Sequence, residues 1–92
     1  MQVTLAGREV TVETSPGVFS PTRLDLGTQV LLRAAGDPPA SGDLLDLGCG
    51  WGPIALSLAL AAPEARVWAV DVNERALDLV RRSAARLALP GI

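Results

Sequence analysis

Residues 44–52 read Leu-Leu-Asp-Leu-Gly-Cys-Gly-Trp-Gly, and Pro53 and a long apolar run follow at once. The leucines predict a short strand that is buried on both faces of a parallel sheet. The alternating glycines end that strand, and Pro53 suits the first turn of a helix because its missing N–H would have no partner there. The stretch therefore predicts a strand, a tight glycine loop and a helix, as in an α/β fold.

Each glycine of the loop has an expected role. Gly48 can adopt backbone angles that are closed to other residues, and Gly50 lets a ligand approach the main chain. Gly52 permits close packing where the helix begins. Cys49 is expected to serve as a small residue between glycines.

An acidic residue before the loop distinguishes two kinds of cofactor. Dinucleotide-binding enzymes carry G-x-G-x-x-G, whereas this chain reads G-x-G-x-G and has Pro53 where a third small residue would stand. Asp46 would repel the anionic pyrophosphate of NAD, but it would attract the ammonium and sulfonium groups of S-adenosylmethionine. The stretch resembles motif I of the class I S-adenosylmethionine-dependent methyltransferases.

A second acid supports this interpretation. Residues 67–70 form a β-rich apolar run, and Asp71 follows it about 20 residues after the glycine loop, where a carboxylate can hold the two hydroxyls of a ribose. Taken alone, Asp71 is equally well explained as an acid before a helix that Asn73 caps. Together with the loop it is predicted to bind ribose, and the predicted site includes the adjacent Val72.

The remaining patterns predict the order of the elements. They are a β-hairpin over residues 1–14, a helix over about 25–35, a linker over 37–42, a helix over 54–62, a second parallel strand over 65–70, and a helix from Asn73 to about Leu87. Ile92 is placed at the start of a third strand. Trp68 is predicted in the sheet core, and Trp51 either flanks the cofactor or packs on a helix.

Composition restricts the chemistry. The 92 residues are 49% hydrophobic with a formal charge of −2, which indicates one globular unit. No apolar run reaches about 18 residues, so no membrane span is expected and the cytoplasm is the expected location. One cysteine and no histidine exclude a Cys–His mechanism and a zinc site within these residues, so no metal is expected.

A more specific resemblance covers much of the chain. The runs Gly17-Val18-Phe19-Ser20, Leu24-Asp25-Leu26-Gly27-Thr28 and residues 71–77 are similar to the ribosomal RNA guanine methyltransferases of the small-domain type. The resemblance implies that Phe19 and Ser20 form a loop over the cofactor, while Asp25 and Thr28 help to hold its methionine end. Judged without the family, Phe19 is a core aromatic and Asp25 a helix cap.

The resemblance also implies a division of the chain. Residues 1–22 would form the hairpin and the cofactor-covering loop, and residues 23–92 an incomplete Rossmann-like domain that binds S-adenosylmethionine, so that the whole is the N-terminal half of a methyltransferase fold. The family holds its target amine with an N-P-P-[aromatic] loop after the fourth strand, which these residues do not reach. The catalytic residues are therefore expected beyond residue 92, and the fragment alone is expected to be inactive.

The implied function is N-methylation of a guanine exocyclic amine in ribosomal RNA, with the RNA or a ribosomal subunit as partner. A release-factor glutamine methyltransferase and a non-catalytic cofactor-binding partner subunit remain alternatives, as does a nicotinamide-dependent oxidoreductase, against which Asp46 and Pro53 argue. The chain departs from the family at Ser83 and Leu87, where asparagines are usual, and this departure concerns the substrate more than the cofactor. The oligomeric state and the target nucleotide are not predicted.

Basic residues on the last predicted helix offer a possible RNA contact. Arg81, Arg82 and Arg86 form a stripe there, but Asp78 interrupts this face and the chain is acidic overall. Solvated arginines are the preferred interpretation.

Overall fold

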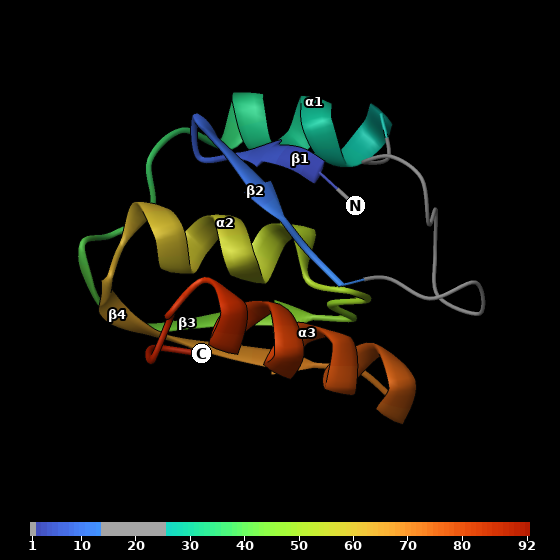
Figure 1. Cartoon of the computed structure of the whole chain (residues 1–92). Coiled ribbons are helices and arrows are strands. Elements are labelled where there is room, and N and C mark those ends of the chain that lie inside the picture. The colour runs from blue at the N-terminus through green and yellow to red at the C-terminus, as the bar shows by residue number, and fades with distance from the viewer. Residues whose placement is uncertain (1, 14–25) are drawn as a thin grey trace.

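The computed structural model describes residues 2–13 and 26–92 of the chain (Figure 1). The elements in chain order are β1 (Gln2–Leu5), β2 (Arg8–Thr11), α1 (Leu26–Ala35), β3 (Ser41–Leu47), α2 (Pro53–Ala61), β4 (Glu64–Val70) and α3 (Glu74–Arg86). β1 pairs antiparallel with β2, and β3 pairs parallel with β4. The predicted α/β fold with an N-terminal hairpin is confirmed.

The hairpin is closed by a two-residue turn at Ala6 and Gly7. Their φ angles are 51° and 76°, and positive φ at both central residues is the requirement of a type I′ turn. The pairing Val3↔Val10 and Leu5↔Arg8 follows from this turn. Val3 and Leu5 point into the core, so the alternation in the sequence is reproduced in the burial of β1.

The β3–α2–β4 unit forms the centre of the molecule. The two strands pair in register from Ser41↔Glu64 to Leu47↔Val70, and α2 connects them, as a parallel pair requires. Figure 1 shows α2 between this sheet and the hairpin, and α2 contacts both β4 and β1. Burial on two sides explains why the sequence of α2 is apolar nearly all round.

The main core lies between the hairpin and the two C-terminal helices. Trp51 is 2% exposed and packs in this core with Leu5, Leu56 and Leu79. Of its two predicted roles, packing on a neighbouring helix is therefore the one that the structure shows. A second cluster joins α2 to the sheet through Ala55, Ala59 and Val67.

The prediction that Trp68 lies in the sheet core is wrong. Trp68 is 52% exposed, and its Nε1–H donates to Asp43 Oδ1 at 3.1 Å. α2 lies on the opposite face of the β3–β4 sheet (Figure 1), and the buried side chains of α3 pack with α2 in the main core. Among the described residues nothing covers the face that carries Trp68, so the apolar side chains that alternate onto it stay exposed: Leu45, Leu47 and Val70.

The chain leaves α3 and returns to the free edge of β4. The backbone N–H of Val67 donates to the carbonyl of Gly91 at 2.7 Å. A side chain on Gly91 would place its Cβ 2.5 Å from the carbonyl oxygen of Ala65, so only glycine permits this approach. The expected third strand at Ile92 stays a prediction, although the backbone contact is of the kind that strands make.

The turn at Ala6 yields a stability prediction. An alanine at positive φ is strained by its Cβ, whereas asparagine tolerates this region and Asn-Gly is the preferred type I′ sequence. Ala6→Asn should raise the free energy of unfolding by up to about 1 kcal/mol, measured by urea denaturation. Gln2→Asn, at an exposed strand position of the same hairpin, is the control. A denaturation midpoint for Ala6→Asn at or below that of the parent chain would contradict the prediction.

Candidate functional site at the carboxyl ends of β3 and β4

The two acids that the sequence singled out lie at one edge of the sheet. Asp46 is near the end of β3, and Asp71 directly follows β4. Because β3 and β4 are parallel neighbours with Leu47 opposite Val70, their carboxyl ends meet. Ligands of open α/β sheets bind at this edge.

The glycine loop between β3 and α2 is attached to the end of β4. The backbone N–H groups of Gly48 and Cys49 both donate to the carbonyl of Val70, at 2.7 and 2.9 Å. The N–H of Gly50 donates to Asp71 Oδ2 at 2.9 Å. The loop and the tip of the second strand therefore form one hydrogen-bonded unit.

The glycines have the properties that were predicted for them. Gly48 has a φ of 75° and Gly50 a φ of 58°, both in the left-handed region that favours glycine. A Cβ on either would meet no atom within 4 Å, so the space beside them is open. At Gly52 a Cβ would lie 3.0 Å from Val80 Cγ2, which confirms that Gly52 permits close packing at the start of α2.

Asp46 supports the N-terminus of α2. Its Oδ2 accepts a hydrogen bond from the backbone N–H of Ala55 at 3.0 Å, and this N–H is one of those that a helix leaves without an internal partner. Gly52, at the N-cap position, makes no side-chain cap, so Asp46 supplies the acceptor from a strand. This bond has no counterpart in a sequence motif, because only the geometry of the loop brings Asp46 and Ala55 together.

Burial sets the protonation behaviour of Asp46. The side chain is 7% exposed, and burial raises the pKa of its carboxyl group above 3.8, while the Ala55 N–H acts against this rise and the charge of Asp71 adds to it. An ionised Asp46 therefore costs stability in the ligand-free protein and leaves a negative charge beneath the loop.

The surroundings of Asp71 favour the ionised form of its carboxyl group, in contrast to those of Asp46. Asp71 Oδ1 accepts from the backbone N–H of Asn73 at 2.8 Å, and Oδ2 of the same residue accepts from Gly50. These two N–H groups, Asn73 first, hold the pKa of the Asp71 carboxyl below 3.8. Asp71 is thus a partly exposed, stably ionised carboxylate beside the loop, and the adjacent Val72 is fully exposed.

Cys49 is a buried thiol within the glycine loop. It is 4% exposed, and its Sγ–H donates to the carbonyl of Gly50 at 3.4 Å. Burial, followed by the charges of Asp46 and Asp71, raises the pKa of the thiol to about 11, so the thiolate is scarce at neutral pH. These properties agree with the expectation of a small buried residue.

The structure brings together only part of the predicted site. Asp46, the glycine loop, Asp71 and Val72 lie together at the sheet edge. Thr28 lies in the first turn of α1. Phe19, Ser20 and Asp25 lie outside the described residues, so their proposed contacts with the cofactor stay predictions.

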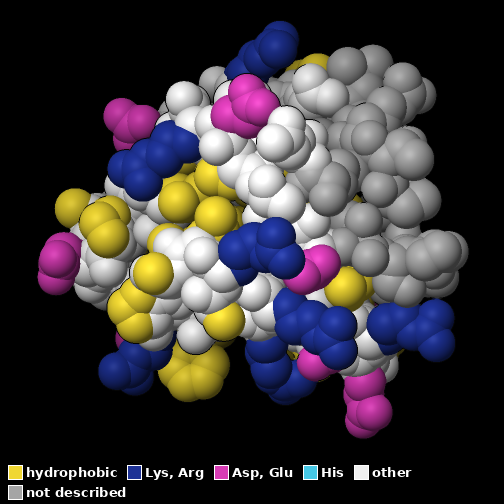
Figure 2. All heavy atoms as spheres, viewed as in Figure 1, with side chains coloured by type: hydrophobic (Ala, Val, Ile, Leu, Met, Phe, Trp, Pro, Cys, Tyr) yellow, Lys and Arg dark blue, Asp and Glu magenta, His cyan; other side chains and the backbone are white. Residues whose placement is uncertain are grey.

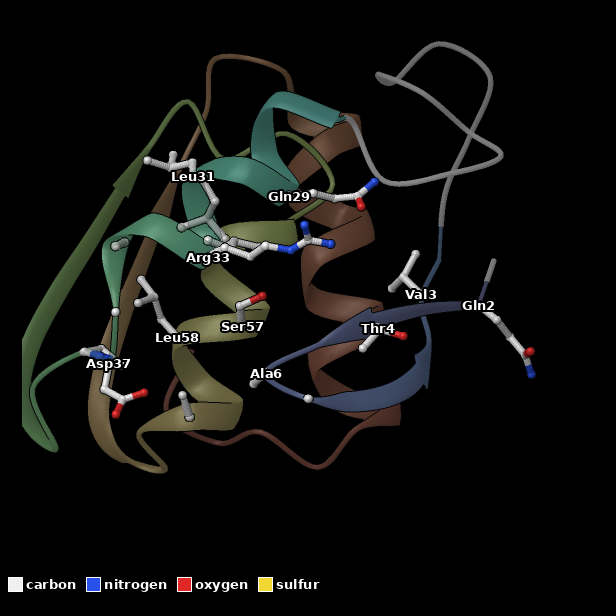
Figure 3. Close-up of a pocket in the computed structure, with 17 residues that line it drawn as sticks. Gln2, Val3, Thr4, Ala6, Gln29, Leu31, Arg33, Asp37, Ser57 and Leu58 are labelled. Carbon is white, nitrogen blue, oxygen red and sulfur yellow. The ribbon is translucent and has the colours of Figure 1, made fainter.

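A groove of about 690 Å³ lies elsewhere, between β1, α1 and α2 (Figure 3). Arg33 extends into the space between Gln29 and Ser57, and Asp37 lies at another part of the rim. Of the predicted site residues that the structure describes, none lines this groove. The sequence gives no signal for it, because its lining comes from three separate segments without a shared motif.

The arginines of α3 do not form a free basic surface. Arg82 Nε lies 3.1 Å from Asp78 Oδ2, and Arg86 Nη2 lies 2.7 Å from Glu13 Oε1. Figure 2 shows basic and acidic side chains interspersed on this face of the molecule. Arg82 and Arg86 remain largely exposed, which agrees with the preferred interpretation of solvated arginines, and their ion pairs were not predicted.

No helix within residues 2–13 and 26–92 is long and apolar enough to cross a membrane. In the same ranges no three Cys, Asp or Glu side chains gather as ligands for a metal ion.

Comparison with known protein families agrees with this geometry. The family model described as "Methyltransferase small domain" matches residues 9–91. The chain belongs to that family. Within that family it resembles the class I S-adenosylmethionine-dependent methyltransferases, among them the ribosomal RNA methyltransferases.

Individual relatives of the methyltransferase small domain family are longer proteins. The chain is 48% identical over 83 residues to ribosomal RNA small subunit methyltransferase C of Aeromonas hydrophila, which covers 90% of the chain and 24% of that protein. The enzyme of the same name from Klebsiella pneumoniae is 40% identical, and the match covers 89% of the chain and 24% of that protein. Uncharacterized protein YbxB of Bacillus subtilis is 39% identical, and the match covers 87% of the chain and 40% of that protein. The chain thus spans less than half the length of these relatives.

The environment of Asp46 predicts how stability depends on pH. A raised pKa means that the folded state holds this proton more tightly than the unfolded chain, so the contribution of Asp46 falls as the pH rises through the raised pKa. Asp46→Asn keeps an oxygen acceptor for Ala55 and cannot ionise. Its free energy of unfolding, relative to the parent chain, should therefore increase between pH 3 and pH 7.

Denaturation by urea at both pH values measures this difference. Asp46→Ala, which loses the acceptor, should be less stable than Asp46→Asn by about 1–2 kcal/mol at either pH, since neither variant ionises at this position. Asp78→Asn, at an exposed helix position, is the charge-matched control. A relative stability of Asp46→Asn that falls with rising pH would show that the ionised carboxylate is favoured in the fold.

Proposed function

We propose that this chain forms the cofactor-binding part of an S-adenosylmethionine-dependent methyltransferase that methylates a guanine exocyclic amine of ribosomal RNA. The observation that carries the proposal is the pairing of two carboxylates around an open glycine loop at the ends of adjacent parallel strands. The family match and the names of the relatives support methyl transfer to small-subunit ribosomal RNA rather than to a release factor.

The residues at the sheet edge fit the proposed cofactor in charge and shape. S-adenosylmethionine, when bound, would supply a methyl group whose carbon can bond to an amine nitrogen while its bond to the positively charged sulfur breaks, so that a neutral thioether leaves and the nitrogen gives up a proton. Asp46 and Asp71 place negative charge near a ligand that has an ammonium and a sulfonium and no phosphate. The open space beside Gly48 and Gly50 lets a ligand reach the main chain.

Each acid has a separate role in the proposal. Asp71 is exposed enough to accept hydrogen bonds from ribose hydroxyls, and its lowered pKa keeps it ionised at neutral pH. Asp46 is buried and already accepts from Ala55, so its contribution to the ammonium end is its charge, acting through water or the loop. The chain's part in the reaction is to bind and orient the reactants and to exclude water.

The substrate side of the proposed enzyme requires further residues. We propose that the target amine is held by a segment that follows these residues in the complete protein, and that the protein acts in the cytoplasm on RNA or on a ribosomal subunit. Residues 1–92 alone should then bind the cofactor weakly and transfer no methyl group.

Calorimetry tests the choice of cofactor. The full-length protein should release or absorb heat on titration with S-adenosylmethionine and give no signal with NAD, because Asp46 and the G-x-G-x-G loop disfavour a pyrophosphate. Binding of NAD with no heat from S-adenosylmethionine would overturn the proposal.

The substrate is tested with radiolabelled cofactor and purified ribosomal subunits. Label should enter ribosomal RNA with the full-length protein and not with residues 1–92. Label in a release factor, or in no macromolecule despite cofactor binding, would replace the proposed substrate with one of the two alternatives. Equal turnover by the 92-residue chain would show that this chain contains a complete active site.

A matched pair of acids tests the role of Asp71. Asp71→Ala removes the proposed acceptor for two ribose hydroxyls, and it should weaken S-adenosylmethionine binding roughly tenfold or more. Asp78→Ala removes an exposed acid whose ion pair with Arg82 is on the surface, and it should leave the dissociation constant unchanged. Equal dissociation constants for the two variants would remove Asp71 from the site.

A further inference from the structure

The short connection between β4 and α3 is held in place by Asn73. The Oδ1 of Asn73 accepts from the backbone N–H groups of Arg75 and Ala76, at 3.0 and 3.4 Å, and so caps α3. Its carbonyl oxygen accepts from the N–H of Leu77 at 3.2 Å. These bonds fix the backbone of Asn73 in an extended conformation, with φ −90° and ψ 107°.

The fixed backbone of Asn73 orients the carboxylate of Asp71. The N–H of Asn73 is the group that donates to Asp71 Oδ1, and at 2.8 Å this is the shorter of the two bonds to that carboxylate. The other oxygen is held from the opposite side by Gly50 of the loop. An otherwise rotatable side chain is therefore clamped between a helix cap and the glycine loop.

The two hydrogen bonds leave the carboxylate of Asp71 able to accept further hydrogen bonds from a ligand. An ionised carboxylate offers about four lone-pair positions, and the two backbone N–H groups occupy one on each oxygen. The remaining positions suffice for two hydroxyl groups. A carboxylate that is oriented before binding avoids the loss of rotamer freedom that a mobile side chain would undergo when the ligand binds.

We infer that Asn73 is a positioning residue of the cofactor site: by capping α3 it aims its own N–H at Asp71 and thereby orients the carboxylate for the ribose. This inference rests on the proposed function. It goes beyond the role of Asn73 as a helix cap. If Asn73 were only a cap, its loss would affect stability alone. If it positions Asp71, its loss also affects ligand binding, and it does so through Asp71.

A double-mutant cycle in the full-length protein separates the two roles. Asn73→Ala should weaken S-adenosylmethionine binding about threefold to tenfold, and Asn73→Ser, which keeps a capping oxygen, should restore binding to within about twofold. In the Asp71→Ala background Asn73→Ala should have no further effect on the dissociation constant, because the carboxylate through which it acts is absent.

Ser83→Ala is the control for general destabilisation of α3. Buried Ser83 accepts from the backbone N–H of Glu13 at 2.8 Å, at the other end of the same helix. Its loss should lower the unfolding midpoint, as Asn73→Ala does, and leave the dissociation constant unchanged. An equal weakening of binding by Ser83→Ala would show that the effect is one of helix stability.

A ligand-free measurement gives an independent readout. The carboxyl carbon of Asp71 can be titrated by NMR, and in Asn73→Ala the pKa of Asp71 should move up toward its ordinary value, since the donor that lowers it most is no longer held in line. Among the described residues, Asp46 and the Cys49 thiol are the titratable groups with an electrostatic interaction with Asp71, and both are present in every variant of this test.

The outcomes distinguish the inference from the function on which it rests. If the parent protein binds S-adenosylmethionine and Asn73→Ala binds equally well, or is weakened equally with and without Asp71, the inference is wrong and the proposed function stands. If the parent protein does not bind the cofactor, both are overturned. An unchanged pKa of Asp71 in Asn73→Ala would overturn the inference without any ligand.

Discussion

The carbonyl group of Val70 is the point on which the site depends. It accepts the N–H groups of Gly48 and Cys49, and the next residue, Asp71, accepts the N–H of Gly50. Three consecutive N–H groups of the loop therefore end on two consecutive residues at the tip of β4. Gly48 and Gly50 have positive φ, and this conformation directs the N–H groups of the loop toward the end of β4. The parallel pairing of β3 with β4 places that end beside the loop. The glycine spacing and the strand pairing therefore act together.

Two acids at this edge have opposite relations to stability. Burial makes the ionised form of Asp46 unfavourable in the ligand-free fold, whereas two N–H groups make the ionised form of Asp71 favourable. Asp46 nevertheless supplies the acceptor that the N-terminus of α2 lacks. A neutral side chain could perform that task, so an ionisable one in this position is consistent with a charge that serves a ligand at some cost in stability.

Local patterns in the sequence were sufficient for the order of the elements and for the motif, although the predicted linker over residues 37–42 is wrong at its end, where Ser41 and Gly42 already pair as part of β3. The Ala-Gly turn, Pro53 at the start of a helix and Asn73 as a cap each act within a few residues, and the structure shows all of them. The bond from Ala55 to Asp46 and the groove beside α1 involve segments that meet only in the fold. They have no counterpart in spacing or composition, and Phe19, Ser20 and Asp25 remain predictions.

The exposed face of the β3–β4 sheet, which carries Trp68, plays no part in orienting the two carboxylates. Apolar strands indicate two covered faces, but the helices among the described residues cover only one, so Trp68 and Leu45 stay exposed. The hydrogen bonds that orient Asp46 and Asp71 come from the glycine loop, α2 and the start of α3, none of which depends on the exposed face. A further layer on that face would therefore leave the orientation of the two carboxylates unchanged, because the glycine loop, α2 and the start of α3 already hold them.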